Sequence, residues 1–425
     1  MRASVTEPAP RHLTKHIAST YFHELAAEYG DYDFSVRLAD GTTLASTPRP
    51  RFALVLSYLS VLPKLFDSPD ELTLGELFIS GDLDVEGDME AAMQFAELLL
   101  SHKSKLMEQK ELGIEAALSA PSSSVRGRNQ ELNGHIHSQE RDRAAIARHY
   151  DVSNDFYKLW LDVNMVYSEA CFESPDEDLD TAQIRKLDYI CRKLRLRPGN
   201  KLLDIECGWG GLVMYAASHC GVYADGITLS LRQAELARER IHSAGLENRC
   251  AVRLCDYRDV EESESYDKIA SIGMCEHVGE STLKHYFEKV FRLLRPGGMF
   301  LNSGIAASAT YRREGPSFID KYVFPDGELV PLCTTIQQAE TSGFEVRDIE
   351  ALREHYALTL DRWVQRLEQH ASEAVQATDE ITYRTWKLYM AASAHAFRTG
   401  RIHLYQVLLG KSDHGQYHLP LTRLD

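Results

Sequence analysis

The stretch KLLDIECGWGGLVMY, residues 201–215, decides the fold. Its first five residues predict a buried strand, and the apolar residues from 211 onward predict a helix, with glycines in the turn between them. A turn of this kind between a strand and a helix brings the backbone close to a nucleotide-like ligand. Where such a turn usually opens with glycine, this chain has Glu206, so its ability to bind a ligand needs support from the rest of the chain.

The segments after this stretch continue to alternate between strand and helix patterns. Apolar runs predict further strands, and amphipathic runs between them predict helices, the last of which stops at Pro-Gly-Gly. The strands are expected at 221–229, 250–260, 266–274 and 299–307, and the helices at 211–220, 230–245 and 281–298. This order predicts an α/β fold with a doubly wound parallel sheet, which binds its ligand at the carboxyl ends of the strands.

The amino-terminal part of the chain has a different pattern. FSVRLADGTTLAS, residues 34–46, alternates around Asp40-Gly41 and predicts a β-hairpin within a smaller α+β domain. The segment between 119 and 143 is nearly empty of large apolar residues, which is typical of a flexible linker. We therefore expect three parts, at 1–120, 121–147 and 148–425.

Composition narrows the class of protein. The 425 residues contain no apolar run of membrane-spanning length, and the amino terminus lacks the apolar core of a signal peptide, so a cytoplasmic location is expected. Eight cysteines are scattered singly, which argues against disulfides and a zinc site. A net charge of −16 counts against nucleic acid as the main partner. Membrane contact would have to come from a local patch.

Two common nucleotide motifs do not fit the glycine turn. The dinucleotide fingerprint fails because Gly208 and Gly210 are followed by Val213, and the lysine of a phosphate loop is absent. The turn keeps an acidic residue, Asp204, in the strand before the glycines. After the third strand, Asp256 is expected to accept a hydrogen bond from an adenine amino group, and Tyr257 to stack beside the ring.

At this point the chain resembles S-adenosylmethionine-dependent methyltransferases, and more narrowly the cyclopropane fatty acid synthase family. The resemblance extends over about residues 148–409, and the amino-terminal domain also resembles the family's accessory lipid-binding domain. It rests on segments that occur in the family's order: HYDVSNDFYKLWLDVNMVYSEACF, LDIECGWGGL, GITLSLRQ, DYRD, IGMCEHVG, LRPGG, FIDKYVFPDGELV and AFRTGRIHLYQVLL.

The resemblance implies an activity, a cofactor and a partner. Enzymes of this family use S-adenosylmethionine to methylate the cis double bond of an acyl chain in a membrane phospholipid, which they contact peripherally. The alkene takes the methyl group and becomes a carbocation, and a base then removes a proton from the new methyl group. In the family that base is usually a bicarbonate ion held by side chains.

The resemblance also assigns residues to the cofactor. Tyr167 and Ser168 match a pair beside its methionine end, Gly208 and Gly210 match the turn glycines, and Thr228 and Gln233 match positions around the ribose. Thr228 stands where many methyltransferases have an acid.

Glu206 allows several interpretations. Its carboxylate could meet the amino or sulfonium end of the cofactor or a ribose hydroxyl, or it could turn away and pack beside Trp209. A residue with a side chain at this position requires a negative φ or stores strain.

The expected catalytic residues lie in separate segments. Glu276 matches the glutamate that holds bicarbonate in the family, and Tyr356 matches a tyrosine near the same anion. His277 is a second candidate for the general base, or a residue that orients Glu276.

Two departures from the family pattern fall at this expected site. The bicarbonate-holding cysteine is replaced by Glu169, and the bicarbonate-holding histidine by Ser303, or by Asn302 if one residue is gapped. Two carboxylates repel an anion, so Glu169 itself is expected to be the base, and burial with crowding should raise one carboxyl pKa towards neutrality. The alternative is that Glu169 faces solvent and bicarbonate binds elsewhere.

These two departures, together with Glu206 in the glycine turn, favour a methylene product over a cyclopropane ring. Reduction to a methyl branch would need a separate reductase, because the chain shows no flavin or nicotinamide motif. A non-catalytic lipid- or cofactor-binding relative and a methyltransferase of soluble small molecules remain alternatives from other classes. A homo-oligomer is expected.

Overall fold

The computed structural model describes residues 19, 20, 22, 33–66, 70–101, 134–150, 152–261, 265–310 and 317–416. The chain forms two compact units. Unit 1 comprises residues 1–129, 314–323 and 379–395, and unit 2 comprises residues 130–313, 324–378 and 396–425. The segments 314–323 and 379–395 fall within the domain predicted at 148–425, and the structure differs there.

The sheet of unit 1 has four strands in the order β2-β1-β3-β4. β1 (Phe34–Leu38) and β2 (Thr43–Ser46) pair antiparallel, which confirms the predicted hairpin. In its turn the Asp40 carboxylate accepts a hydrogen bond from the Thr42 amide at 2.8 Å, and Gly41 adopts a φ of +85°. β3 (Phe52–Leu56) runs parallel to β1, and β4 (Leu83–Gly87) runs antiparallel to β3.

The two segments from later in the sequence belong to unit 1 because they bond to its helices and strands. Arg384 Nε donates to the carbonyl of Phe78 at 2.6 Å, and Lys321 pairs with Glu76 at 2.6 Å. The helices of unit 1 are η1 (Leu59–Val61), α2 (Leu62–Phe66), α3 (Glu71–Ile79), α4 (Met89–Ser101), α13 (Phe318–Tyr322) and α17 (Glu380–Thr399) as far as residue 395.

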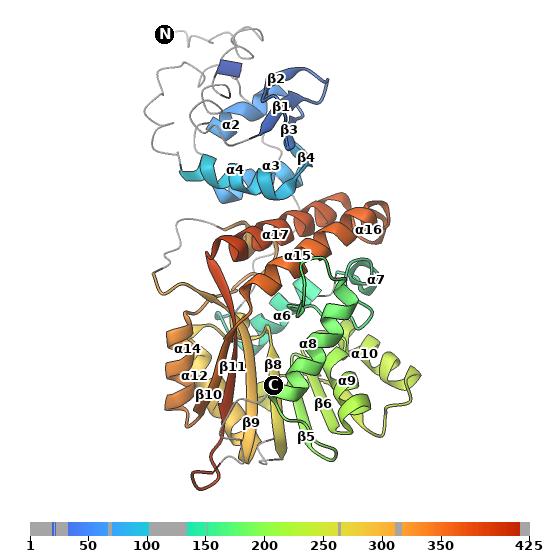
Figure 1. The fold of residues 1–425 in the computed structure, drawn as a ribbon, viewed down its shortest axis with the longest axis vertical. Coiled ribbons are helices and arrows are strands. Elements are labelled where there is room, and N and C mark those ends of the chain that lie inside the picture. Colours follow the sequence, from blue (N-terminus) through green and yellow to red (C-terminus); the bar gives the residue numbers. More distant parts are fainter. Residues whose placement is uncertain are drawn as a thin grey trace. The chain divides into compact units, whose positions relative to one another are not determined.

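Unit 2 contains a seven-stranded sheet in the order β10-β11-β9-β8-β5-β6-β7 (Figure 1). The five strands from β5 to β9 are parallel, which confirms the α/β fold, whereas β11 pairs antiparallel with β9 and β10. The strands are β5 (Lys201–Ile205), β6 (Tyr223–Thr228), β7 (Cys250–Leu254), β8 (Tyr266–Ile272), β9 (Leu294–Ala307), β10 (Glu345–Ala351) and β11 (Ile402–Gly410).

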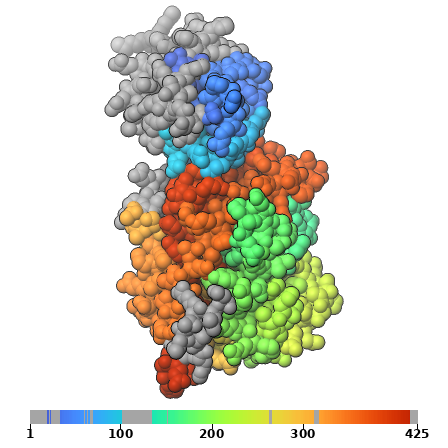
Figure 2. Space-filling view, in the orientation of Figure 1, coloured from blue at the N-terminus to red at the C-terminus, as the bar shows by residue number. Residues whose placement is uncertain are grey.

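Helices cover both faces of this sheet. Leu202 of β5 packs on one face with Leu187 and Val213, and Leu203 packs on the other with Leu283 and Phe287. Helices α8 and α10 lie on the outer surface of unit 2 (Figure 2). The helices are α6 (Gln139–Tyr150), α7 (Asn154–Lys158), α8 (Leu179–Lys193), α9 (Gly211–Cys220), α10 (Leu231–Ser243), η4 (Tyr257–Asp259), α11 (Cys275–Val278), α12 (Glu280–Leu293), α14 (Leu332–Thr341), α15 (Arg353–Gln369) and α16 (Ala371–Ala377).

The linker predicted at 121–147 is wrong for its last part. Residues 139–147 belong to helix α6, in which Ile146 and His149 are buried. Residues 121–133 lie outside the described residues. Helix α6 is short of large apolar residues, so its order depends on polar contacts from distant segments, which a local composition pattern does not reveal.

Candidate active site

The turn after β5 opens onto a pocket. Gly208 has a φ of +56° and Gly210, which precedes helix α9, a φ of +81°, both in the region that favours glycine. A Cβ added at Gly208 would meet no atom within 4 Å, and the same holds at Gly273 after β8. Both glycines line the pocket, so the backbone at the carboxyl ends of β5 and β8 leaves space for a ligand.

This pocket has an empty volume of about 710 Å³, which includes space open to solvent. Its lining combines residues from α6, the segment before α8, α8 itself, the glycine turn and α10. Six of the predicted cofactor residues lie in the lining, together with His277: Tyr167, Ser168, Asp204, Glu206, Gly208 and Gln233.

Glu206 adopts a φ of +58°, not the negative φ that would avoid strain. The strained backbone costs on the order of 1–3 kcal/mol. Glu206 Oε2 accepts hydrogen bonds from the Thr228 hydroxyl at 3.2 Å and the Leu229 amide at 3.3 Å. Burial raises the pKa of Glu206 to about 8. The carboxylate thus turns to the end of β6, where the family resemblance expects the ribose, and its bonds are not directed at Trp209.

Thr228 lies behind the pocket. Its side chain is fully buried, and its hydroxyl is 2.8 Å from Gln233 Oε1 as well as bonded to Glu206. Thr228 therefore positions two lining residues. Asp225, an acidic residue on β6, accepts a hydrogen bond from the Tyr266 hydroxyl at 3.0 Å.

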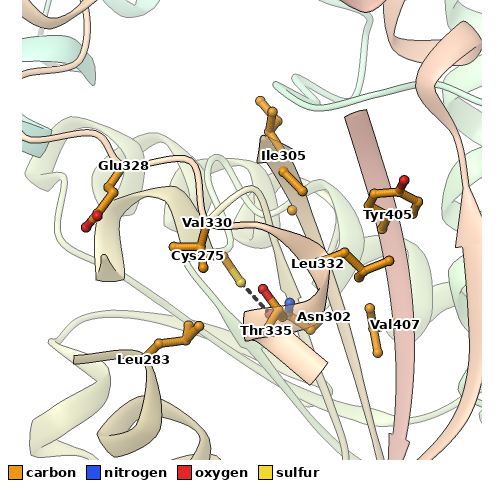
Figure 3. A pocket seen from close by; sticks show the side chains of 12 residues that line it. Cys275, Leu283, Asn302, Ile305, Glu328, Val330, Leu332, Thr335, Tyr405 and Val407 are labelled. Atoms are coloured by element: carbon orange, nitrogen blue, oxygen red, sulfur yellow. Dashed lines mark hydrogen bonds between the residues drawn. The ribbon is translucent and has the colours of Figure 1, made fainter. Parts of the chain in front are cut away.

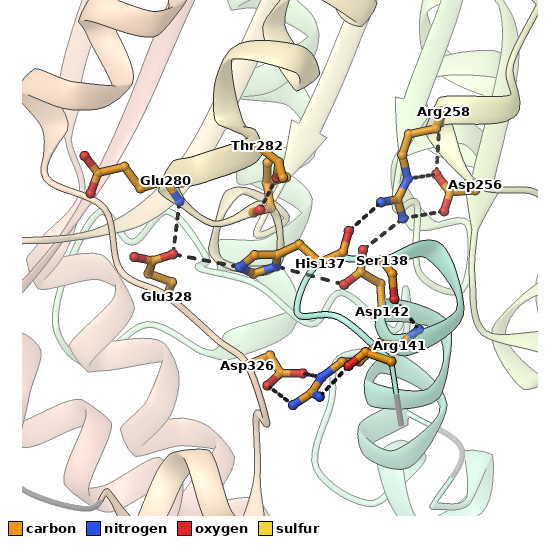
Figure 4. A network of polar contacts seen from close by, with 12 residues as sticks. His137, Ser138, Arg141, Asp142, Asp256, Arg258, Glu280, Thr282, Asp326 and Glu328 are labelled. Carbon is orange, nitrogen blue, oxygen red and sulfur yellow. Dashed lines mark hydrogen bonds and ion pairs between the residues drawn. The ribbon is translucent and has the colours of Figure 1, made fainter. Parts of the chain in front are cut away.

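The structure does not bring Asp256 and Tyr257 into the pocket lining. Asp256 accepts two hydrogen bonds from the Arg258 guanidinium, at 2.9 and 2.7 Å, which satisfy its carboxylate (Figure 4). Tyr257 makes an edge contact with Tyr286 at 5.3 Å between ring centroids. A local motif placed these residues after the correct strand, but the tertiary partners of their side chains could not be predicted from it.

Helix α6 forms one wall of the pocket through Ile146 and Tyr150. Ion pairs hold its first turn to other segments of unit 2: Arg141 Nε lies 2.6 Å from Asp326, and Asp142 lies 2.9 Å from Arg258 (Figure 4). These contacts explain why the segment predicted as a linker is helical.

The methionine-end pair is held by residues that the sequence analysis missed. The Tyr167 hydroxyl lies 3.2 Å from His149 Nε2, and Ser168 Oγ accepts a hydrogen bond from Lys186 Nζ at 2.7 Å. Lys186 is buried and also lines the pocket. One signal in the sequence could have indicated Lys186. Helix α8 has an apolar face formed by Leu187 and Ile190, and the helical spacing puts the polar residues Gln183 and Lys186 on that same buried face.

Glu169 is buried, with an exposed fraction of 1%, so the alternative that it faces solvent is wrong. Its Oε1 accepts hydrogen bonds from the Ser303 hydroxyl at 3.1 Å and from Gln406 Nε2 at 3.0 Å. Asn302, the alternative to Ser303, instead accepts a bond from Cys275 Sγ at 3.0 Å. Gln406 lies on β11, and no pattern in the sequence analysis pointed to it.

Glu276 stands beside this group. Its Oε1 accepts a hydrogen bond from the Ile305 amide at 2.7 Å, while its Oε2 is buried and has no hydrogen-bond partner among the described residues. Burial raises the pKa of Glu276 to about 7, and the charge of Glu169 acts in the same direction. This is the direction expected for crowded, buried carboxyls. We call Glu169, Glu276, Ser303 and Gln406 the acid cluster.

Of the other catalytic candidates, His277 lines the pocket and Tyr356 does not. Burial lowers the pKa of His277 to about 4, so its imidazole is neutral at neutral pH and a weak base. The Tyr356 ring stacks on Phe397 with centroids 4.7 Å apart, in helix α15. No residue of the acid cluster lines the large pocket. The pocket is lined instead by Ser168, which precedes Glu169 in the sequence, and by His277, which follows Glu276.

A second pocket is lined by Cys275, the residue before Glu276 in the sequence (Figure 3). It has an empty volume of about 350 Å³ and a mostly apolar lining from β9, β11 and α14. A Cβ on Gly304, one of its lining residues, would lie 3.8 Å from Glu276 Oε2. The free oxygen of Glu276 is therefore close to this second space.

A sheet of this order with a ligand pocket at the glycine turn is the arrangement of S-adenosylmethionine-dependent methyltransferases. The cyclopropane synthase MmaA2 from Mycobacterium tuberculosis is similar over 65% of this chain and 100% of its own, with a TM-score of 0.61 and 31% identity. The mycolic acid cyclopropane synthase CmaA1 complexed with SAH and CTAB is similar over 63% of this chain and 97% of its own, with a TM-score of 0.60 and 33% identity.

The family model for mycolic acid cyclopropane synthetase matches residues 137–407, and the chain belongs to this family. A probable fatty acid methyltransferase from Pseudomonas putida is 38% identical over 92% of this chain and 95% of its own length. The cyclopropane-fatty-acyl-phospholipid synthase of Escherichia coli K12 is 38% identical over 64% of this chain and 70% of its own. The predicted family is confirmed, and the predicted cofactor, S-adenosylmethionine, follows from it.

Proposed function

We propose that this chain methylates the cis double bond of an unsaturated acyl chain in a membrane phospholipid, and that the product carries a methylene branch. The observation that carries the proposal is the acid cluster, in which the buried carboxylate of Glu169 is held by Ser303 beside Glu276. The names of the relatives from Pseudomonas putida and Escherichia coli support a fatty acyl substrate.

The large pocket fits the cofactor. The open space at Gly208 would admit the cofactor against the backbone, and Glu206 and Gln233 would hold its hydroxyl groups. When bound, S-adenosylmethionine supplies an electrophilic methyl group. Ser168 and Asp204 line this pocket, and Ile146 and Tyr150 of helix α6 form one of its walls.

The acid cluster supplies the base. As the new carbon–carbon bond forms at one alkene carbon, the neighbouring carbon becomes a cation, which nearby carboxylates stabilise. Glu169 then accepts the proton. The cluster does not fit a bicarbonate ion, because two carboxylates repel it and the donors to them, Ser303, Gln406 and the Ile305 amide, are neutral and already used.

The methylene product follows if a hydride moves before the proton leaves. The hydride shift puts the cation on the carbon that bears the new methyl group. Loss of a proton from that methyl group to Glu169 then leaves a double bond between the chain carbon and a terminal CH2 group. A cyclopropane ring is the second candidate product. The free Oε2 of Glu276 favours it, since a second acceptor near the cation can take the methyl proton before any hydride shift.

The test is lipid analysis of cells that express this chain alone. Both products make an acyl chain heavier by one methylene unit, so mass spectrometry must be followed by derivatisation selective for double bonds. We expect a methylene product that reacts with the double-bond reagent and that is present only in cells expressing this chain. A resistant product would establish the ring, and unmodified lipids would contradict the function altogether.

Among the described residues, no helix has the length and apolar character needed to span a bilayer. Independently of that finding, we propose peripheral contact with the membrane from the cytoplasm, a homo-oligomer, and a separate reductase where a saturated methyl branch is made. The rival reading, a non-catalytic binding protein, predicts lipid contact without turnover, and the expression experiment distinguishes the two.

A further inference from the structure

Lys186 is a buried cation in the wall of the cofactor pocket. It lies on α8 with an exposed fraction of 2%, and its Nζ donates to Ser168 Oγ at 2.7 Å. An ammonium has three donors, and burying it is unfavourable unless those donors find acceptors. Within the described residues, Ser168 is its only hydrogen-bond partner in the structure. The pocket-facing ammonium therefore has capacity for an anionic group of a ligand.

A buried anion stands in the same wall. Asp204, at the end of β5, is 3% exposed and lines the pocket. Burial raises the pKa of Asp204 to about 7, and the charge of Lys186 opposes that rise, so the two charges act on each other. In the described part of the chain they do not approach as a direct ion pair. The pocket thus presents a separated cation and anion.

This pattern matches the two charges of an α-amino acid. We propose that Lys186 Nζ binds the carboxylate at the amino-acid end of the cofactor, while Asp204 accepts its ammonium group. The inference rests on the proposed function and adds a specificity-determining residue to it. Lys186 also keeps the Ser168 hydroxyl directed into the same end of the pocket.

A purely structural role for Lys186 makes a different prediction. If the lysine only neutralises buried acids, its removal lowers stability and weakens every pocket ligand to the same degree. If it binds a carboxylate, its removal weakens only ligands that carry one. A double-mutant cycle distinguishes the two roles. It compares ligand affinity after removal of the lysine, after removal of the ligand carboxylate, and after removal of both.

The experiment is calorimetric titration of the full chain with S-adenosylhomocysteine and with its decarboxylated analogue, which lacks only the carboxylate. For the unaltered chain we expect the analogue to bind about 10- to 100-fold more weakly, the effect of one charge-assisted hydrogen bond. For Lys186→Met we expect S-adenosylhomocysteine to weaken by that factor and the analogue to bind within about twofold of its original affinity.

Lys289→Met is the matched control. Lys289 is also a buried lysine, on α12, and its Nζ donates to the Val260 carbonyl at 2.6 Å, but it does not line the pocket. Both ligands should bind this variant with unchanged affinity, although it loses a buried ammonium in the same way.

Several results would overturn the inference. Equal weakening of both ligands in Lys186→Met, or unchanged binding of S-adenosylhomocysteine, removes Lys186 as the carboxylate partner. If Lys186→Met does not fold, the unaltered chain still tests the inference. Equal affinity of that chain for the two ligands would show that Lys186 does not bind the carboxylate. If the unaltered chain binds neither ligand, both the cofactor assignment and this inference are wrong. If the chain binds the cofactor but the lipids of the expressing cells stay unmodified, only the proposed lipid activity is contradicted.

Discussion

The cofactor pocket and the acid cluster are neighbouring parts of unit 2 that follow the family pattern to different degrees. The pocket keeps Tyr167, Ser168 and the turn glycines, and its one departure, Glu206, still turns its carboxylate to Thr228. The acid cluster replaces two of the expected bicarbonate-holding residues. Binding a common cofactor restricts the pocket, whereas the outcome of the reaction depends on a few side chains that can change without disturbing the fold.

The two parts also differ in how they are built. The pocket opens at the glycine turns that follow the adjacent parallel strands β5 and β8. The acid cluster is an arrangement of side chains from the segment before α8 and from α11, β9 and β11. We therefore expect substitutions in the cluster to change turnover and product, and substitutions in the pocket to change affinity.

The largest effect is expected for Glu169→Gln. The amide cannot accept the proton, so kcat should fall about 100- to 10,000-fold, while calorimetric affinity for S-adenosylhomocysteine stays within about twofold. Glu173→Gln is the matched control, since Glu173 is an exposed acid four residues away that pairs with Arg185 at 3.2 Å. Turnover near the original rate in Glu169→Gln would exclude Glu169 as the base.

The next effect concerns pH. The pKa of Glu276 is about 7, so kcat should rise with pH through about 7 as a second carboxylate becomes available to stabilise the cation. Glu276→Gln should remove this inflection and lower kcat about tenfold or more. An unchanged pH profile in the variant would show that another group titrates.

The same pKa predicts the pH dependence of stability. The folded-state pKa of Glu276 lies above the ordinary value of 4.5, so its burial lowers stability increasingly as pH rises from 4.5 through about 7. Glu276→Gln should therefore be less sensitive to pH over this window in thermal unfolding. A parallel loss of stability with pH in both proteins would contradict this assignment.

A smaller effect is expected in the pocket, and it has opposite signs in two assays. Glu206→Gly relieves a φ of +58° and removes a buried acid, which should raise the free energy of unfolding by about 1 kcal/mol. It should also weaken S-adenosylhomocysteine about tenfold by removing an acceptor. Unchanged affinity and product would make Glu206 a bystander to function.

The smallest effect is expected for Ser303→Ala. This change removes one of the two donors to Glu169 Oε1 while Gln406 remains, so kcat should fall about three- to tenfold. Ser218→Ala, at an exposed serine on α9, should leave kcat unchanged. A loss as large as that of Glu169→Gln would mean that Ser303 acts directly on the reactants.

Features of the fold and the site that depend on a local sequence pattern, or on matching a position in the family, could be predicted from the sequence. Strand–helix alternation predicted the parallel sheet, and the turn glycines marked the pocket. Strands β10 and β11 were missed, as was the membership of 379–395 in unit 1, because both depend on contacts between distant segments. Of these two strands, only β11 runs antiparallel to the strands from β5 to β9. Asp256 was predicted at the right strand end, but its carboxylate pairs with Arg258.

The acid cluster shows the same limit at the level of side chains. Glu169, Glu276 and Ser303 could be predicted one by one, and the pKa of Glu276 moved in the expected direction. Gln406 could not be assigned in this way, because it matters through one hydrogen bond to Glu169, which lies far away in the sequence. The helical spacing of Lys186 marked it as a buried polar residue, but its bond to Ser168 could not be predicted from that spacing. The sequence also gave no means to see that helix α6 closes the pocket.

The central claim, that Glu169 replaces a bound bicarbonate as the base, is tested most directly by the bicarbonate dependence of turnover. The rate of methyl transfer to unsaturated phospholipid vesicles should be measured in buffer stripped of carbon dioxide and again after bicarbonate is restored. We predict the same rate in both conditions. A rate that falls on depletion and recovers when bicarbonate is added would contradict the claim.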